Sequence, residues 1–278
     1  MTARVPLTLL YVPADRPDRI QRALDSSADV VIIDLEDAVT PAGKESARRT
    51  VAALEFEPGR SVQVRVNAAG TPWHDDDLAM AASLDERVQL RLPKCESAEA
   101  IEAVADRVGS RALHLLVESA LAVERAYLLA GSHPQVATIG LGEADLLADL
   151  RATDPAALGW ARGRIVTAAA AAALPAPTMS VFPDHRDSGG LRASCREGRS
   201  LGFLGRAAIH PAQLPVIVEA FAPSTAEIAV AQEVVAAAEA GAQIGRGAVA
   251  LPSGKFVDAA VVRQARIVLS LADRHGHA

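Results

Sequence analysis

Charged and polar side chains follow several short apolar runs of the sequence. They are Asp34, Glu36 and Asp37 after VVII, Arg65 and Asn67 within and after VQVRV, Lys94 and Glu96 after VQLRL, Glu118 after LHLLV, Glu143 and Asp145 after VATIGL, Asp184 and His185 after TMSVF, and His210 after AAI. Burying such groups without partners is costly, so we expect them to contact one another. Several acids and one arginine that converge form an oxygen-rich site, which suits a hard divalent cation together with a carboxylate-bearing ligand.

Glu118 and Asp145 follow two successive apolar runs and would place two carboxylates near one point. Mg2+ typically takes one or two carboxylates and completes its shell with water and substrate oxygens. The alternative is that these acids form only hydrogen bonds and salt bridges at a protein rim. His210, which precedes Pro211, is expected to fix the end of its strand rather than to bind a ligand.

Short apolar runs alternate with longer helical stretches, and this alternation is typical of βαβ units with a parallel sheet. We expect strands at residues 7–12, 30–33, 62–66, 88–92, 113–117, 136–141, 178–182 and 207–209, and helices at 17–26, 42–54, 75–84, 97–108, 120–130, 155–174 and 190–201. Eight such units predict a closed (β/α)8 TIM barrel over residues 1–212. The carboxyl ends of its strands would then carry the polar residues at one catalytic face.

Residues 213–278 exceed what a minimal barrel needs. Helical patterns at 225–240 and 258–274 flank a glycine-punctuated stretch at 245–254. We interpret this segment as a C-terminal helical extension, a lid that packs on the barrel mouth or on a neighbouring subunit.

Composition excludes several classes of protein. The 278 residues carry 28 Lys and Arg against 34 Asp and Glu, for a net charge of -6, and only 3% are aromatic. An acidic chain with few aromatic residues is not expected to bind nucleic acid. No stretch is expected to span a membrane. The two cysteines, Cys95 and Cys195, give no disulfide framework, so we expect a cytoplasmic protein.

Eight motifs resemble those of citrate lyase β-subunit-like proteins of the HpcH/HpaI aldolase superfamily. They are LYVPADRPDRIQRAL, VVIIDLEDAV, VRVN, RLPKCES, LLVES, GLGEADLLADL, GFLGRAAIHPAQ and GKFVDAAVVRQA, in the expected order over nearly the whole chain. The resemblance implies a trimeric or hexameric Mg2+-dependent barrel that cleaves or forms β-hydroxyacyl thioesters of the malyl-CoA or citramalyl-CoA type. The products are a 2-oxo acid and an acyl-CoA, and thioester hydrolysis is a conceivable second step.

The resemblance also implies roles for individual residues. Glu118 and Asp145 would bind Mg2+, Arg65 the substrate carboxylate, and Glu36 would lie beside Arg65 and the metal waters. Asp258 would act as the acid or base from a lid, which in relatives often belongs to a neighbouring subunit. Arg16 and Lys44 match positions that meet CoA phosphates.

Two departures from the family pattern affect the lid and the substrate range. Ala259 and Ala260 follow Asp258 where the family usually has a proline, and Pro183 and Asp184 occur where many relatives have a simpler acidic stretch.

Three other functions remain open at this point. A Schiff-base aldolase would need a lysine at a strand end, and of Lys44, Lys94 and Lys255 only Lys94 is so placed; we favour an ion pair with nearby acids for it. A citrate lyase β subunit would act on citryl-acyl carrier protein. A non-catalytic barrel would serve as a binding module.

Overall fold

The computed structural model of the protein describes residues 6–243, 245–251 and 253–274. The chain divides into two compact units, Met1–Phe221 and Ala222–Ala278. The boundary expected from the sequence, after residue 212, falls before helix α10 (Leu214–Phe221), which packs on helix α9 (Ser188–Leu201) within the first unit.

The first unit is built on one parallel sheet whose strands are hydrogen-bonded in the order β6-β5-β4-β3-β2-β1-β7. The strands are β1 (Thr8–Pro13), β2 (Val30–Asp34), β3 (Ser61–Arg65), β4 (Gln89–Leu92), β5 (Leu113–Val117), β6 (Val136–Leu141) and β7 (Arg206–Ala208). Most of their residues are buried, as is usual in a parallel sheet, although β3 and β4 alternate polar and apolar residues. The α/β class predicted from the sequence is therefore correct.

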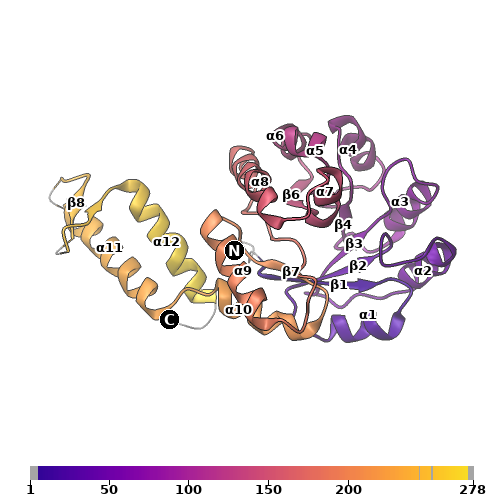
Figure 1. Cartoon of the computed structure of the whole chain (residues 1–278), viewed down its shortest axis with the longest axis horizontal. Helices are drawn as coiled ribbons and strands as arrows, with labels where there is room; N and C mark the ends of the chain where they lie inside the picture. The colour runs from indigo at the N-terminus through magenta and orange to yellow at the C-terminus, as the bar shows by residue number, and fades with distance from the viewer. Residues whose placement is uncertain (1–5, 244, 252, 275–278) are drawn as a thin grey trace. The chain divides into compact units, whose positions relative to one another are not determined.

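Helices cover the outside of the curled sheet in chain order (Figure 1). In addition to α9 and α10 they are α1 (Pro17–Leu24), α2 (Lys44–Ala52), α3 (His74–Ser83), α4 (Ala98–Ala105), α5 (Ala120–Glu124), α6 (Ala126–Ala130), α7 (Glu143–Asp149) and α8 (Gly159–Ala171). Short 3-10 turns occur at Pro41–Gly43, Pro155–Leu158 and Pro211–Gln213. Helices α7 and α10 are not among the helices expected from the sequence.

The prediction of a closed eight-stranded barrel is wrong: within the described residues the sheet has seven strands and is open. The segment 178–182, expected as a strand, makes a single bridge between Met179 and Arg206. The Met179 amide donates to the Gly205 carbonyl at 3.0 Å, but no described backbone bond joins the segment to β6. Pro177 and Pro183, which bound the segment, lack the N–H groups that a longer ladder needs.

The inner face of the sheet is polar. Register aligns Asp34 with Arg65, Arg65 with Arg91, and Arg91 with His114 on four neighbouring strands. His114 contacts the Thr138 hydroxyl at 2.8 Å and the Gln89 amide oxygen at 2.7 Å. These buried groups therefore have hydrogen-bond partners, and the face that carries them forms the floor of the site.

The second unit is a helical hairpin. Helix α11 (Thr225–Gln243) packs on helix α12 (Ala259–Arg274). The two helices are joined by a short β-hairpin of the antiparallel strands β8 (Val249–Ala250) and β9 (Phe256–Val257). A small core holds the hairpin together, and its buried members are Ala231, Val234, Leu251, Val257 and Ala265. This unit matches the helical extension predicted from the sequence in its secondary structure, whereas its role as a lid stays a prediction.

One described stretch, Pro211–Gln243, is long and apolar enough to cross a membrane by length and composition, contrary to expectation. Buried core helices of proteins outside membranes satisfy the same criterion, so length and composition alone do not identify a membrane span. The helix is interrupted between Phe221 and Thr225, and it is divided between the two units.

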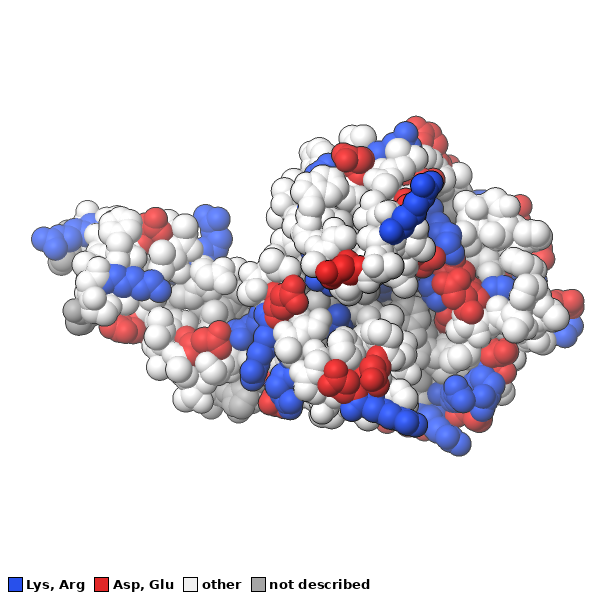
Figure 2. Space-filling view, viewed as in Figure 1, with Lys and Arg blue, Asp and Glu red and all other residues white. Residues whose placement is uncertain are grey.

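On the face of the molecule in Figure 2, acidic and basic side chains are interspersed.

Candidate active site

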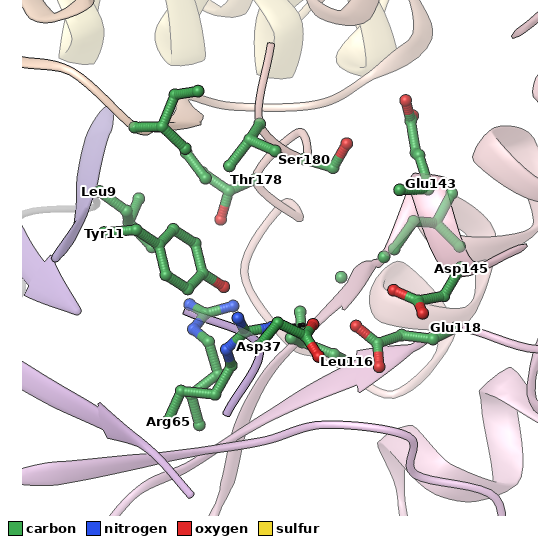
Figure 3. A pocket seen from close by; sticks show the side chains of 18 of the residues that line it. Leu9, Tyr11, Asp37, Arg65, Leu116, Glu118, Glu143, Asp145, Thr178 and Ser180 are labelled. Carbon is green, nitrogen blue, oxygen red and sulfur yellow. Dashed lines mark hydrogen bonds and ion pairs between the residues drawn. The ribbon is translucent and has the colours of Figure 1, made fainter. Parts of the chain in front are cut away.

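A pocket of about 620 Å3 opens on the inner face of the sheet in the first unit. Its charged and polar lining comes from residues of six strands or of the loops and helix that follow them, including Tyr11, Asp34, Asp37, Arg65, Arg91, Glu118, Thr138, Glu143 and Asp145. Figure 3 shows Tyr11 and Arg65 on one side, and Glu118 and Asp145 on the other. The strand-end residues predicted to converge thus include Arg65, Glu118 and Asp145 in one cavity.

Arg65 ends β3 and is held by acids of the neighbouring strand and loop. Asp34 accepts from Nε at 2.7 Å and from Nη2 at 2.6 Å, and Asp37 accepts from Nη1 at 3.4 Å. Burial alone would lower the pKa of Arg65, but the bonds to Asp34 outweigh it and raise the pKa above its ordinary value. Three of the five guanidinium N–H groups are engaged by described carboxylates, and one on each Nη remains to take a bidentate carboxylate.

Glu36 lies beside Arg65 and is buried, with an exposed fraction of 5%. Its Oε1 accepts from Nζ of Lys94 at 2.6 Å. Its Oε2 lies 2.9 Å from Nη1 of Arg65 without hydrogen-bond geometry and has no hydrogen-bond partner among the described residues. Burial raises the pKa of Glu36 despite both cations. This oxygen is enclosed by the protein, and Glu36 is not among the residues that line the pocket.

Lys94 pairs with acids, as predicted. Burial lowers the pKa of its amine, but the bond to Glu36 and the nearby acids raise it, with the net result above its ordinary value. A protonated amine is a poor nucleophile, so this environment does not favour a Schiff base.

Glu118 follows β5 and is almost fully buried. Its Oε2 accepts from the backbone amide of Lys94 at 3.0 Å. Burial, followed by repulsion from Glu36 and Asp145, raises the pKa of Glu118 to about 7. Such a carboxylate is stabilised by a cation that replaces the lost solvation.

Asp145 lies in the first turn of α7, directly after β6, and its carboxylate faces that of Glu118 (Figure 3). At Gly142 a β-carbon would overlap with the Glu118 side chain, so glycine leaves the space that this carboxylate occupies. Among the described residues, no cluster of three or more His, Cys, Asp or Glu side chains is placed to hold a metal. Two facing carboxylates, one of them buried and destabilised, nevertheless fit Mg2+, which keeps several waters.

Of the other predicted site residues, Lys44 and Arg16 are not among the residues that line this pocket. Lys44 is buried, and its three donors bind Leu35 O, Glu36 O and the Asn67 side chain, so none is left for a phosphate. Arg16 is half exposed and pairs with Asp18 at 3.1 Å. Asp258 belongs to the second unit, where its Oδ1 accepts from Ala260 and Val261 amides at 2.9 Å and caps α12. The CoA-phosphate role of Arg16 and the acid-base role of Asp258 stay predictions, whereas the engaged amine of Lys44 does not favour a phosphate contact.

Arg91 and Tyr11 line the pocket although sequence reasoning did not single them out. A signal was present, because VQVRV and VQLRL alternate polar and apolar residues within a parallel sheet. Strands buried on both faces normally lack that alternation.

Relatives of known name match nearly the full chain. It is 36% identical to the (3S)-malyl-CoA thioesterase of Cereibacter sphaeroides, over 96% of this chain and 94% of the relative. It is 31% identical to the L-malyl-CoA/beta-methylmalyl-CoA lyase of Rhodobacter capsulatus, over 98% and 96% of the two chains.

A solved structure shares the fold. The protein CitE from Mycobacterium tuberculosis, in complex with magnesium, acetoacetate and coenzyme A, is 33% identical, with a TM-score of 0.84 over 98% of this chain and 100% of that one. Residues 7–211 match the sequence pattern of one family. Together with the identities above, this match shows that the chain belongs to the HpcH/HpaI aldolase/citrate lyase family.

Proposed function

We propose that the protein is a Mg2+-dependent carbon-carbon lyase that cleaves or forms a β-hydroxyacyl-CoA thioester of the malyl-CoA or citramalyl-CoA type. The observation that carries this proposal is the pocket, which sets Arg65 across from the carboxylates of Glu118 and Asp145. The relative from Rhodobacter capsulatus is named as such a lyase, and the Mycobacterium tuberculosis complex holds magnesium and coenzyme A.

Glu118 and Asp145 would hold Mg2+, which when bound supplies a Lewis acid and a template for substrate oxygens. Arg65 would bind the carboxylate of the oxo-acid portion through the N–H groups that Asp34 and Asp37 leave free. Because Asp34 fixes the guanidinium through two bonds, the carboxylate is received in one orientation.

Cleavage breaks the bond between the carbinol carbon and the α-carbon of the thioester. The hydroxyl proton is lost to a base, an oxo acid remains, and the acyl-CoA leaves as an enolate that must gain a proton at its α-carbon. We assign that proton to Asp258. Asp258 occupies the position of the lid aspartate in the family motif, which supports the assignment, and in this structure its Oδ1 caps α12.

A thioesterase activity is the second candidate, because the relative at 36% identity is named as a malyl-CoA thioesterase. Hydrolysis consumes water and releases free CoA and a hydroxy acid, whereas cleavage releases an acyl-CoA and an oxo acid. Incubation of the purified protein with Mg2+ and malyl-CoA or citramalyl-CoA, followed by chromatographic identification of both products, separates the two reactions.

Variations of this assay, together with calorimetry, test the remaining alternatives. Loss of turnover with EDTA, without borohydride trapping of substrate on the protein, supports metal dependence and excludes an imine at Lys94. Turnover of citryl-acyl carrier protein but not of CoA esters would indicate a citrate lyase β subunit. Absence of turnover and of calorimetric oxo-acid binding with Mg2+ would leave only a binding module.

We also propose a homo-oligomer, trimeric or hexameric, in a reducing compartment such as the cytoplasm. Tyr127 and Leu128 on α6 and Trp160 on the contacting helix α8 expose large apolar side chains, which supports self-association. Cys95 and Cys195 are free, buried thiols. Light scattering after size exclusion measures the oligomeric state.

A further inference from the structure

Arg91 is a buried cation at the floor of the pocket. It lies on β4 beside Arg65 of β3 in the register of the sheet, and its exposed fraction is 6%. Both side chains line the same cavity. The pocket therefore contains two guanidinium groups from adjacent strands.

The two arginines differ in how their charge is neutralised. Arg65 has Asp34, Glu36 and Asp37 within ion-pair distance. Arg91 donates its Nε to the neutral Gln63 side chain at 2.9 Å, and no described carboxylate forms an ion pair with it. A buried charge without an opposite partner is costly, because the interior does not replace its solvation.

The remaining neighbours of Arg91 do not supply that charge. Burial lowers the pKa of Arg91 and Arg65 repels its charge, whereas Tyr11 and Glu118 favour its charged form. Burial raises the pKa of Tyr11, so its hydroxyl stays neutral and can donate a hydrogen bond. Glu118 is assigned to the metal. An anion from outside the protein would complete this environment.

We propose that Arg91 and Tyr11 form a second anion subsite, which binds the terminal carboxylate of a dicarboxylic 2-oxo acid. The inference rests on the proposed lyase activity, in which Arg65 takes the carboxylate next to the oxo group. It extends the substrate range beyond malyl-CoA and citramalyl-CoA, whose oxo acids carry one carboxylate, to thioesters that release an oxo acid with two. Arg91 then selects oxo acids that carry another carboxylate at the far end. A planar guanidinium matches a carboxylate through two parallel hydrogen bonds.

The position of the subsite favours a small carboxylate over a CoA phosphate. Arg91 lines the pocket together with Leu9, Tyr11, Leu116 and Thr138, which are residues within the sheet rather than in the loops after it. Because residues within the sheet form this part of the wall of a pocket of about 620 Å3, we expect a small carboxylate rather than the bulky nucleotide part of CoA at Arg91.

Oxaloacetate and 2-oxobutyrate test the proposal because they differ only at the far end of the molecule, where oxaloacetate has a carboxylate and 2-oxobutyrate has a methyl group. Calorimetric titration with Mg2+ present should show that the wild-type protein binds oxaloacetate about 10- to 100-fold more tightly, as expected for a charge-assisted hydrogen-bonded pair. Arg91→Met should abolish that preference and Arg91→Lys should retain part of it. Arg192→Met, a change at a surface ion pair with Glu219, is the control and should retain all of it.

Absence of the preference in the wild-type protein, or its survival in Arg91→Met, would overturn the proposal. If circular dichroism shows that Arg91→Met does not fold, Tyr11→Phe decides: a smaller preference supports the subsite, and an unchanged one refutes it. Failure of the proposed function gives a different result, in which no oxo acid condenses with acetyl-CoA while the binding preference persists. Failure of this inference gives condensation without preference.

Discussion

Gly142 lies so close to Glu118 that a β-carbon at position 142 would overlap with the glutamate carboxylate. Gly142→Ala should therefore displace Glu118 and weaken Mg2+ binding, which calorimetry measures directly. Gly163→Ala is the matched control, because a β-carbon there meets nothing within 4 Å inside α8. That control should leave Mg2+ binding unchanged and stabilise the helix by about 0.5 to 1 kcal/mol. Equal Mg2+ affinity in both variants would contradict the role of Gly142.

Removal of the Glu118 charge should weaken Mg2+ binding more than displacement of Glu118 by Gly142→Ala. Glu118→Gln should weaken Mg2+ binding by more than the roughly 10- to 100-fold loss seen when a residue that only orients a metal ligand is changed. Glu124→Gln, at the end of α5, is the control and should bind Mg2+ as the wild type does. An unchanged Mg2+ affinity in Glu118→Gln would exclude it as a ligand.

Asp34 positions Arg65 through a buried bidentate pair. Asp34→Asn should release the guanidinium, raise the KM for the oxo acid, and lower the free energy of unfolding by about 3 kcal/mol, since one buried charge loses its partner. The exposed pair of Asp18 with Arg16 provides the comparison. Asp18→Asn should change the unfolding free energy by less than about 1 kcal/mol. Steady-state kinetics and urea unfolding measure both effects, and a wild-type KM in Asp34→Asn would refute the positioning role.

Asp258→Asn separates catalysis from folding, because asparagine is as good an N-cap as aspartate. The α12 cap should survive, and circular dichroism should be unchanged. Turnover should be lost, whereas Mg2+ and oxo-acid binding should remain. Normal turnover in this variant would exclude Asp258 as the acid or base.

His114 should make the protein sensitive to mild acid. Burial, with Arg91 nearby, lowers its pKa from 6.5 to about 3, so below pH 6.5 the unfolded chain gains a proton that the folded protein does not. Stability from this group is complete above pH 6.5 and decreases as the pH falls toward 3. Between pH 7 and pH 5 the wild type should lose about 2 kcal/mol more unfolding free energy than His114→Gln. His185→Gln, a change at an exposed histidine, is the control and should lose as much unfolding free energy as the wild type. Equal losses in all three proteins would contradict the prediction.

The positions of Arg65, Glu118 and Asp145 in one pocket follow from local sequence. Each comes at or just after the end of an apolar run, and the ends of parallel strands meet at one edge of a sheet. The burial of Lys44 did not follow, because its acceptors include Asn67, which lies on another loop. Such partners depend on packing between distant segments.

The local sequence pattern also did not show whether the sheet closes into a barrel. The run TMSVF has the composition of a strand, yet it bonds toward β7 and not toward β6. Helix α10 was not expected from the sequence, since its branched apolar residues do not show a clear helical pattern. A capping box made by His210 and Gln213 begins the 3-10 turn before this helix, so His210 makes a structural contact just after β7.

Lys94 adopts a φ of 51°, a left-handed conformation that is uncommon for residues other than glycine. In this conformation its amide holds Glu118 while its side chain holds Glu36, the neighbour of Arg65. One backbone position thus ties the metal half of the pocket to the anion half. Occupation of either half reduces the freedom of the other, so cation and oxo acid should bind cooperatively, and each should raise the affinity of the protein for its companion by the same factor.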